Sequence, residues 1–322
     1  MNDALKLLDR LLLRPFGYRI TRSGQVNLRP LAHPERLRDP DSLLAAKALF
    51  DRTGNAPAPV ALTVMARTCL RDPRRARRHD LVDDSLETVV RACLGSLVAS
   101  VNHAAEAAGL EDLRVEVDDD HSDADARALI EATLSRLTVP WTLRTAEVTK
   151  AGPVMHAQFK RAAGADRLIY FVEDDYLHQP EAVASMVGFY RQVHAATGGH
   201  LMLHPQEQRV LYTRHYPSYL VMGADRRWRS TGHMSHTLFT HGSVLRDHWT
   251  HFENTRYVGH PKRRVAHQGA ERRTTNRVLD VLPGFCPVPA LAAHFQAEGL
   301  LPPFFDWRAL YDAHRPDDAG GP

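Results

Sequence analysis

Two runs of acidic side chains are the clearest candidates for chemistry in this sequence. Glu173, Asp174 and Asp175 follow the uninterrupted apolar run Leu168 to Val172, and Asp118 to Asp120 follow an earlier apolar stretch. Adjacent carboxylates repel one another, and the repulsion is poorly screened at the end of a buried strand, so we expect a cation to join them. Mg²⁺ or Mn²⁺ fits, because both prefer carboxylate oxygens and complete their shells with water and substrate phosphates. The alternative is that these acids cap the next helix and face water.

The elements that must position these acids follow the rhythm of an α/β sheet. From Val60 onward, short apolar strands alternate with amphipathic helices, which indicates a mostly parallel sheet with helices on both faces. Ligands of such sheets bind beyond the carboxyl ends of the strands, where both acidic runs are expected. The expected strands cover residues 60–66, 113–117, 141–145 and 168–172.

Capping patterns predict where the helices begin. Asp84 opens the first helix, with Glu87 placed to complete a capping box, and Ser122 with Asp125 repeats the pattern before the second. A further helix is expected after Pro180.

Bulk properties narrow the class of protein. With 322 residues, 43% hydrophobic and 25% charged, the chain can form one large α/β domain or two modest domains that share a cleft. A net charge of +3 is too small and too evenly mixed in sign to indicate nucleic-acid binding. Cys69, Cys93 and Cys286 lie far apart with no CxxC pair, which favours a reducing, cytoplasmic compartment. The oligomeric state is not predicted.

The two acidic runs also resemble, in their order and placement, motifs of GT-A-fold glycosyltransferases of the family 2 type. Residues 117–125 resemble the second-strand turn of that family, and residues 168–180 resemble its aspartate motif with the following helix, so that the resemblance covers roughly residues 60–200. It implies a GT-A, Rossmann-like sheet flanked by helices, a nucleotide-sugar donor, and a metal ion on the diphosphate. The first turn would read the nucleoside and the second would hold the metal.

Individual roles follow from the resemblance. It assigns nucleotide contacts to Thr68, Asp118, Asp120 and Asp174, and metal ligation to Glu173 and Asp175. Two departures from the family pattern stand out. The first strand ends in Ala-Arg-Thr instead of the Pro-Thr-x-Asn type, and the metal motif is Glu-Asp-Asp instead of Asp-x-Asp.

Two downstream residues are candidates on the same grounds. Inverting sugar transfer needs a carboxylate base near the acceptor hydroxyl, and Glu271 is the best-placed match to the base of similar enzymes. The alternative for Glu271 is a surface carboxylate paired with Arg272 or Arg273. His294 is a candidate third metal ligand, because some GT-A enzymes add a C-terminal histidine; its alternative is a packed residue on a short apolar stretch.

Other polar segments carry weaker signals. The histidines between residues 232 and 267 lack the ligand spacing of zinc sites and are assigned to the acceptor side or the surface. Residues 228–236 suit a sugar-binding loop. The basic loop 71–78 would steer an anionic donor or an anionic lipid-linked acceptor, or would simply be solvated. Residues 1–13 predict an amphipathic helix, which would rest on a membrane surface or cover the protein's own core.

Four parts of the chain follow from these patterns. They are an N-terminal helical extension (1–56), a nucleotide-sugar-binding α/β core (57–200), an acceptor-side region that completes the cleft (201–315) and a disordered tail (316–322).

The predicted activity is metal-dependent glycosyl transfer of the hexosyltransferase type. It would move a sugar from a nucleotide diphosphate to a hydroxyl of a glycan, a lipid-linked or a small-molecule acceptor, with inversion. The setting would be the cytoplasm or the inner face of the membrane. A nucleotidyltransferase is the enzymatic alternative, but the loop after the first strand lacks the glycine-rich sequence that would favour it. A non-catalytic sugar- or nucleotide-binding relative is the other alternative.

Overall fold

The computed structural model describes residue 11 and residues 58–70, 81–208, 210–213, 218–257 and 271–316. Most of the predicted N-terminal extension, the basic loop 71–78 and most of the predicted tail lie outside these residues. Among the described residues, none of the helices combines the length and the apolar character needed to cross a membrane.

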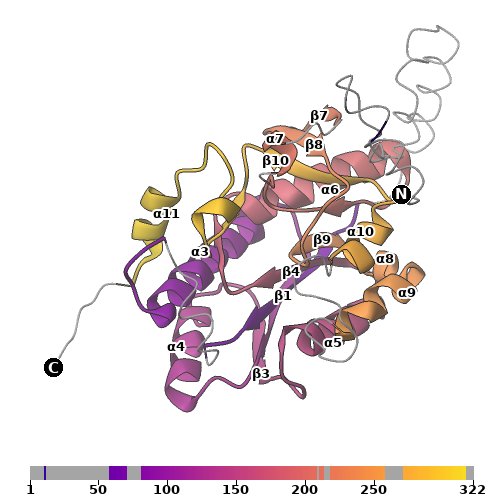
Figure 1. The fold of residues 1–322 in the computed structure, drawn as a ribbon. Helices are drawn as coiled ribbons and strands as arrows, with labels where there is room; N and C mark the ends of the chain where they lie inside the picture. The colour runs from indigo at the N-terminus through magenta and orange to yellow at the C-terminus, as the bar shows by residue number, and fades with distance from the viewer. Residues whose placement is uncertain are drawn as a thin grey trace, which may run out of the picture.

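A nine-stranded sheet lies at the centre of the described chain, in the order β3-β2-β1-β4-β9-β6-β10-β8-β7 (Figure 1). Its strands are β1 (Ala61–Thr68), β2 (Asp112–Asp119), β3 (Trp141–Thr145), β4 (Leu168–Glu173), β6 (Met202–Leu203), β7 (Leu220–Met222), β8 (Arg227–Ser230), β9 (Leu238–His241) and β10 (Gly284–Val288). The four strands β3, β2, β1 and β4 are mutually parallel, as are β6 and β10. In contrast, β9 runs antiparallel to both of its neighbours, β4 and β6.

The α/β class with a mostly parallel sheet, expected from the sequence and from the family resemblance, is therefore confirmed. Strands from beyond residue 200 extend the sheet that begins with β1 to β4. The division of the chain into separate parts stays a prediction. A second, two-stranded antiparallel sheet joins β5 (Tyr176–His178) to β11 (Ala292–His294).

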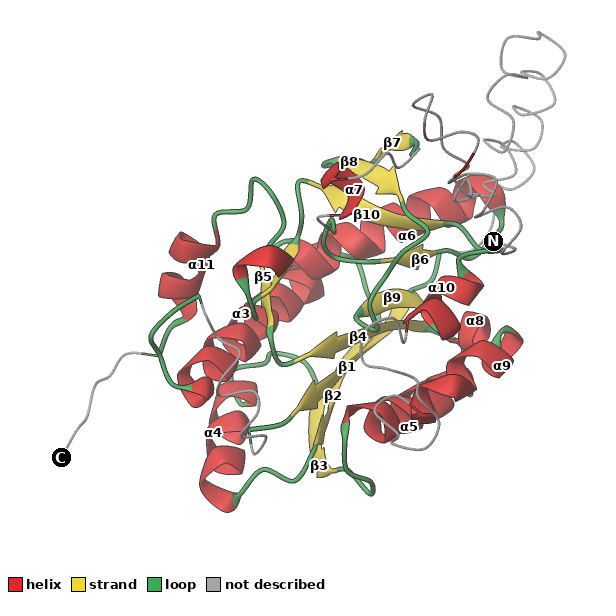
Figure 2. Cartoon of the chain, in the orientation of Figure 1, coloured by secondary structure: helices red, strands yellow, loops and turns green. Residues whose placement is uncertain are grey.

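Helices cover both faces of the large sheet (Figure 2). The helices of the described chain are α3 (Leu86–Ala107), α4 (Ala124–Leu134), α5 (Ala151–Ala163), α6 (Ala182–Thr197), α7 (Val210–Thr213), α8 (Gly242–Asp247), α9 (Trp249–Phe252), α10 (Thr275–Val278) and α11 (Trp307–His314), with 3₁₀ turns at Glu253–Tyr257, Glu271–Arg273 and Glu298–Leu300. One face carries α3, α4 and α6, and α11 packs on α3. The other face carries α5 together with α8, α9 and α10.

Alternating side chains of the central strands supply both faces of the core. In β1, Leu62 and Val64 join the cluster under α3 and α6, whereas Met65 joins the cluster under α5. In β4, Tyr170 and Phe171 divide in the same way. Successive residues of a strand point to opposite faces, so a strand covered on both sides reads as an unbroken apolar run. This confirms the reading of residues 168–172 as a buried central strand.

The predicted start of α3 is wrong by one residue. Ser85, not Asp84, caps the helix, and its side chain accepts the backbone N–H three residues further on at 3.1 Å. Glu87 therefore lies in the first turn, where its charge suits the helix dipole, but does not complete a capping box. Asp84 instead accepts hydrogen bonds from Tyr311 at 2.9 Å and Arg315 at 2.6 Å. It therefore ties α11 to the start of α3.

The predicted start of α4 is wrong in a similar way. Asp123 caps the helix by accepting the backbone N–H of Ala126 at 2.9 Å. Ser122 turns back instead and donates from its hydroxyl to Asp119 at 2.7 Å. Serine and aspartate are comparable caps, so the sequence pattern alone does not choose between neighbours.

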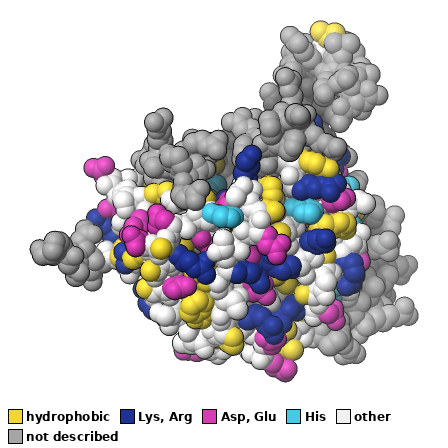
Figure 3. All heavy atoms as spheres, turned by 90° about the horizontal axis from the view of Figure 1, so that it is seen from below, with side chains coloured by type: hydrophobic (Ala, Val, Ile, Leu, Met, Phe, Trp, Pro, Cys, Tyr) yellow, Lys and Arg dark blue, Asp and Glu magenta, His cyan; other side chains and the backbone are white. Residues whose placement is uncertain are grey.

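On the surface seen from below, basic and acidic side chains are interspersed (Figure 3). This matches the evenly mixed charge of the sequence.

Candidate active site

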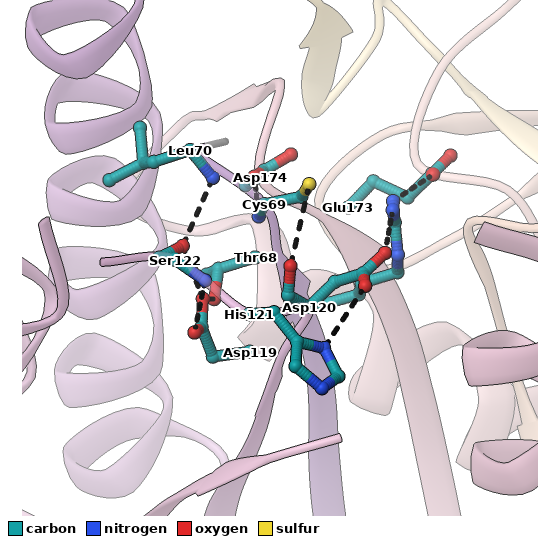
Figure 4. A network of polar contacts seen from close by, with 10 residues as sticks. Thr68, Cys69, Leu70, Asp119, Asp120, His121, Ser122, Glu173 and Asp174 are labelled. Atoms are coloured by element: carbon teal, nitrogen blue, oxygen red, sulfur yellow. Dashed lines mark hydrogen bonds and ion pairs between the residues drawn. The ribbon is translucent and has the colours of Figure 1, made fainter. Parts of the chain in front are cut away.

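The two acidic runs meet at one edge of the sheet, which we call the carboxyl edge because β1, β2 and β4 all end there. The register places Thr68 of β1 beside Asp119 of β2, and Arg67 of β1 beside Glu173 of β4. Since β1 lies between β2 and β4, the ends of the three strands are immediate neighbours. Figure 4 shows the side chains of this edge directed toward one another. The expected convergence of the two runs is confirmed.

A buried arginine links the two acidic runs. Arg67 is only 5% exposed and lies 3.0 Å from Asp120 and 3.5 Å from Glu173, measured between its terminal nitrogens and the carboxylate oxygens. A guanidinium can bridge two carboxylates in this way because it carries several donors in one plane. Part of the positive charge that the sequence argument required is therefore supplied by the chain itself. Arg67 belongs to the Ala-Arg-Thr strand end, which departs from the family pattern. That departure was the sequence signal that could have pointed to Arg67.

Hydrogen bonds within the carboxyl edge also fix Thr68 and Asp174. Thr68 donates from its hydroxyl to Asp119 at 2.9 Å, and the backbone N–H of Cys69 donates to Asp174 at 2.7 Å (Figure 4). Asp119 and Asp174 are 1% and 4% exposed. These bonds hold the end of β1 against the ends of its two neighbours. The roles of Thr68, Asp120 and Asp174 in nucleotide binding stay predictions.

Asp118 lies under two arginines. Arg144 of β3 approaches one of its carboxylate oxygens at 2.9 Å, and Arg161 of α5 forms an ion pair with the other. Asp118 is 3% exposed, whereas both guanidinium groups are more than one-third exposed. A nucleoside that came to Asp118, as the resemblance implies, would therefore meet Arg144 and Arg161 as well.

The two-stranded sheet brings His294 back to the acidic motif. Its register places His294 beside Tyr176, the residue after Asp175. As a result, the Nε2 atom of His294 lies 3.3 Å from Oδ2 of Asp175, and the N–H of Phe295 donates to the backbone oxygen of Asp175 at 2.6 Å. Asp175 is 4% exposed. His294 was a candidate ligand from the sequence, although Asp175 lies far from it in the chain. The fold brings it to Asp175.

The spacing of Asp175 and His294 suits a small divalent cation. Two neighbouring ligands on an octahedral Mg²⁺ or Mn²⁺, with bonds of about 2.1 Å, lie about 3 Å apart. Glu173 is turned toward Arg67. Among the described residues, no group of three or more His, Cys, Asp or Glu side chains is arranged to hold a metal. A cation bound by Asp175 and His294 would thus complete its shell with water and substrate oxygens.

Neutral polar side chains surround this pair. The Tyr176 ring stacks on the His294 imidazole with centroids 4.8 Å apart and planes 7° apart. Burial raises the pKa of Tyr176 and lowers the pKa of His204 to about 3, so both are uncharged at neutral pH. Tyr176 reaches Ser235 at 3.1 Å, and Ser235 reaches His204 at 3.2 Å.

Glu271 lies near His233 and His236, which flank Ser235 in the chain. Burial lowers the pKa of His233 and of His236, and the negative charge of Glu271 offsets part of this effect in both. His236 is hydrogen-bonded to Thr274 at 2.9 Å. His236 follows Ser235 in sequence, so a short chain of contacts joins the loop of Glu271 to Tyr176. The role of Glu271 as a base stays a prediction.

The predicted sugar-binding loop 228–236 and the histidines between residues 232 and 267 lie in several different parts of the fold. Of residues 228–236, Trp228 is fully buried and stacks on Phe189 at 4.3 Å, so its ring serves the core. Ser235 contacts the hydroxyl of Tyr176 at 3.1 Å. His241 lies at the far end of β9. His260 and His267 lie outside the described residues.

Comparisons with known proteins give weak similarities. No protein-family model matches the sequence, and no curated protein is significantly similar to it. Among solved structures, S. aureus TarS 1–349 aligns at 14% identity over 70% of this chain and 57% of that chain, with a TM-score of 0.41. TarS 1–349 in complex with UDP-GlcNAc aligns at 15% identity over 61% and 53% of the two chains, with a TM-score of 0.38.

A third similar structure is UDP-glucose pyrophosphorylase complexed with UDP-glucose. It aligns at 9% identity over 79% of this chain and 98% of that chain, with a TM-score of 0.43. The aligned part covers little more than half of TarS 1–349. All of these TM-scores and identities are low, so the function of this chain has to be inferred from its own site.

Proposed function

We propose that this chain is a divalent-cation-dependent glycosyltransferase that moves a sugar from a nucleotide diphosphate to an acceptor hydroxyl. The observation that carries the proposal is the pair formed by Asp175 and His294, 3.3 Å apart, at the edge of the sheet where β1, β2 and β4 end. Open α/β sheets bind ligands at this edge. The pair offers one carboxylate oxygen and one imidazole nitrogen at the separation of neighbouring metal ligands.

Asp175 and His294 would hold Mn²⁺ or Mg²⁺, which supplies charge neutralisation for the departing nucleotide diphosphate. Arg67 pairs with Asp120 and Glu173 at the same edge of the sheet and offsets part of their negative charge. Asp118, with Arg144 and Arg161, is proposed to contact the nucleoside.

On the acceptor side, Glu271 is proposed to take the proton of the attacking hydroxyl. A neutral hydroxyl is a poor nucleophile, and a carboxylate within hydrogen-bond reach activates it as the bond to the sugar forms. Attack from the side opposite the nucleotide inverts the anomeric centre. The acceptor is proposed to be a hydroxyl of a glycan, of a lipid-linked molecule or of a small molecule.

A ligand screen tests the site directly. The thermal midpoint of unfolding is measured with UDP, GDP, ADP, CDP and dTDP, each with and without Mn²⁺, for the wild type and for Asp175→Ala. A ligand that binds only the folded state at about 100 times its Kd stabilises it by about 2.7 kcal/mol. We expect one nucleotide to give such a shift with Mn²⁺ and Asp175→Ala to abolish it.

Asp112→Ala is the matched control, because Asp112 is a paired carboxylate at the opposite end of β2. It should keep the nucleotide-dependent shift. If none of the nucleotides shifts the wild type, the proposal is wrong. Two incubations then separate the activities. With the corresponding sugar nucleotide and an acceptor, release of nucleoside diphosphate with sugar on the acceptor indicates a glycosyltransferase. With the nucleoside triphosphate and a sugar 1-phosphate, formation of the nucleotide sugar and pyrophosphate indicates a nucleotidyltransferase.

A further inference from the structure

Tyr176 is the side chain that covers the imidazole of His294. The two rings lie 4.8 Å apart and almost parallel, and Tyr176 is 1% exposed. A metal-ligating nitrogen binds in the plane of its ring, so the ring must be held at one rotation for Nε2 to face Asp175. A flat neighbour across the ring face opposes that rotation. The orientation of His294 therefore depends on the position of Tyr176.

The donors around Ser235 define how Tyr176 is held. The backbone N–H of Gln206 donates to Nδ1 of His204 at 3.3 Å. A neutral His204 therefore carries its proton on Nε2, which donates to the hydroxyl oxygen of Ser235 at 3.2 Å. The N–H of Thr237 donates to the same oxygen at 3.2 Å. With both lone pairs engaged, the Ser235 hydroxyl donates its own proton to the phenol oxygen of Tyr176 at 3.1 Å.

The same segment of chain also fixes His294 from its backbone. Gln206, two residues after His204, accepts the N–H of His294 on its side-chain oxygen at 2.6 Å and donates from its side-chain nitrogen to Leu300 at 2.9 Å. His294 is thus fixed through its backbone by Gln206 and through its ring by Tyr176. Both contacts come from His204 and Gln206, which lie just after β6. Strand β6 is parallel to β4 and ends at the same edge of the sheet.

We propose that Tyr176 is a positioning residue that sets the direction of His294 toward a bound cation, and that Ser235 and His204 hold it in place. This rests on the proposed function, because it assumes that Asp175 and His294 bind a divalent cation. Groups that orient a metal-ligating histidine affect metal affinity without touching the metal. Tyr176 acts here through its ring face, and its hydroxyl serves as the anchor.

Mn²⁺ binding to the full chain, measured by electron paramagnetic resonance without nucleotide, tests the proposal. Tyr176→Leu removes the stacked ring and should weaken Mn²⁺ affinity about 10-fold or more. Tyr176→Phe and Ser235→Ala each remove the anchoring hydrogen bond but keep the ring, and each should weaken affinity about 5-fold. Because both remove the same bond, the double variant should be no weaker than either single variant.

Two further variants separate positioning from general damage. In a His294→Ala background, Tyr176→Leu should leave the residual Mn²⁺ affinity unchanged, because Tyr176 acts only through His294. Tyr190→Phe is the matched control: it also removes a buried phenol hydroxyl, one that is hydrogen-bonded to His200 at 2.8 Å away from this site. It should bind Mn²⁺ as the wild type does.

The outcomes are distinct. If the wild type binds no Mn²⁺, the cation site and the positioning role are both overturned. If the wild type binds Mn²⁺ and Asp175→Asn abolishes binding, but Tyr176→Leu binds equally well, only the positioning role is overturned. The positioning role also fails if Tyr190→Phe weakens binding as much as Tyr176→Phe, or if Tyr176→Leu still weakens binding when His294 is absent.

Discussion

The two edges of the large sheet hold similar side chains in different arrangements. At the carboxyl edge, Asp175 faces a nitrogen of His294. At the opposite edge, where β2 and β4 begin and β9 ends, Asp112 is 2.8 Å from Arg167, and three histidines lie together. Both edges are therefore rich in titratable groups, and composition does not distinguish them.

The difference lies in how the rings are turned. At the opposite edge, His194 stacks on His200 and His200 stacks on His241, with centroids 5.2 and 4.5 Å apart and planes 12° and 7° apart. Parallel rings cannot share one ion, because each nitrogen binds in the plane of its own ring. His294 is stacked on a phenol instead, so its nitrogen remains directed at a carboxylate. A cluster of histidines is thus a weaker sign of a metal site than one histidine beside one aspartate.

The largest expected difference between the edges is in turnover. Asp175→Asn keeps the shape of the side chain and removes its charge, and we expect it to lower the rate of the proposed Mn²⁺-dependent sugar transfer at least about 100-fold. Asp112→Asn should change that rate less than about 2-fold. Initial rates and thermal midpoints of both variants are the measurement. Equal losses of rate in the two variants would remove the distinction between the edges.

The next effect is an acid sensitivity that belongs to the opposite edge. Burial lowers the pKa of His200 to about 4, with a further contribution from His241 and His194, while Asp247 and Asp166 oppose it. The unfolded chain has the ordinary histidine pKa of about 6.5. The unfolded state therefore binds the proton first, so this stability is fully present above about pH 6.5 and is lost as the pH falls toward 4.

Because His200 is half-buried, solvent screening keeps the loss through it below about 3 kcal/mol. Urea unfolding at pH 7, 6, 5 and 4 should show a shallower decline for His200→Gln than for the wild type, while sugar transfer at pH 7 is unchanged. His103→Gln, at an exposed position on α3, should keep the wild-type decline. An equally steep decline in His200→Gln would contradict the assignment.

The smallest effect is expected at Asp112. Hydrogen bonds from Arg167 and then Arg114 hold the pKa of this carboxyl far below its usual range. A depressed carboxyl pKa gives stability that is present above about pH 4 and is lost as the pH falls further. The Asp112 side chain is 42% exposed, so solvent screens its ion pairs and the effect should stay below about 1 kcal/mol. Thermal midpoints between pH 5 and 2 should fall less in Asp112→Asn, and Arg167→Gln should reproduce more of this change than Arg114→Gln. A larger effect from Arg114→Gln would reverse the assigned order.

The central strand β4 could be predicted from sequence because burial on both faces leaves a pattern, and the half-exposed edge strand β3 was predicted as well. Trp141–Thr145 was predicted with its observed bounds, and β4 was predicted to within one residue. A strand buried on both faces is mostly apolar, as β4 is over residues 168–172. The helix caps were less certain for a physical reason: Asp84 and Ser85 are adjacent, and both can accept a backbone N–H.

The later strands left no such pattern. Strands β6, β7, β8 and β9 have only two to four residues, too few for any periodicity to show. Their pairing is decided by tertiary contacts. The antiparallel insertion of β9 was therefore not predicted.

The site was predicted in part. The convergence of Asp120 and Glu173 follows from parallel strands ending together, and it was predicted. The bridge made by Arg67 was not, because it depends on a side chain reaching both neighbours across the strand ends. His294 was proposed by resemblance, and only the pairing of β5 with β11 shows which carboxylate it meets.

The pairing of β5 with β11 also sets when the site can exist. Asp175 is synthesised well before His294, because it precedes it in the chain. A nascent chain that has completed β1 to β4 therefore contains every strand of the acidic cluster and still lacks half of the proposed cation pair. Competence to bind the cation would appear late and abruptly, when β11 docks onto β5.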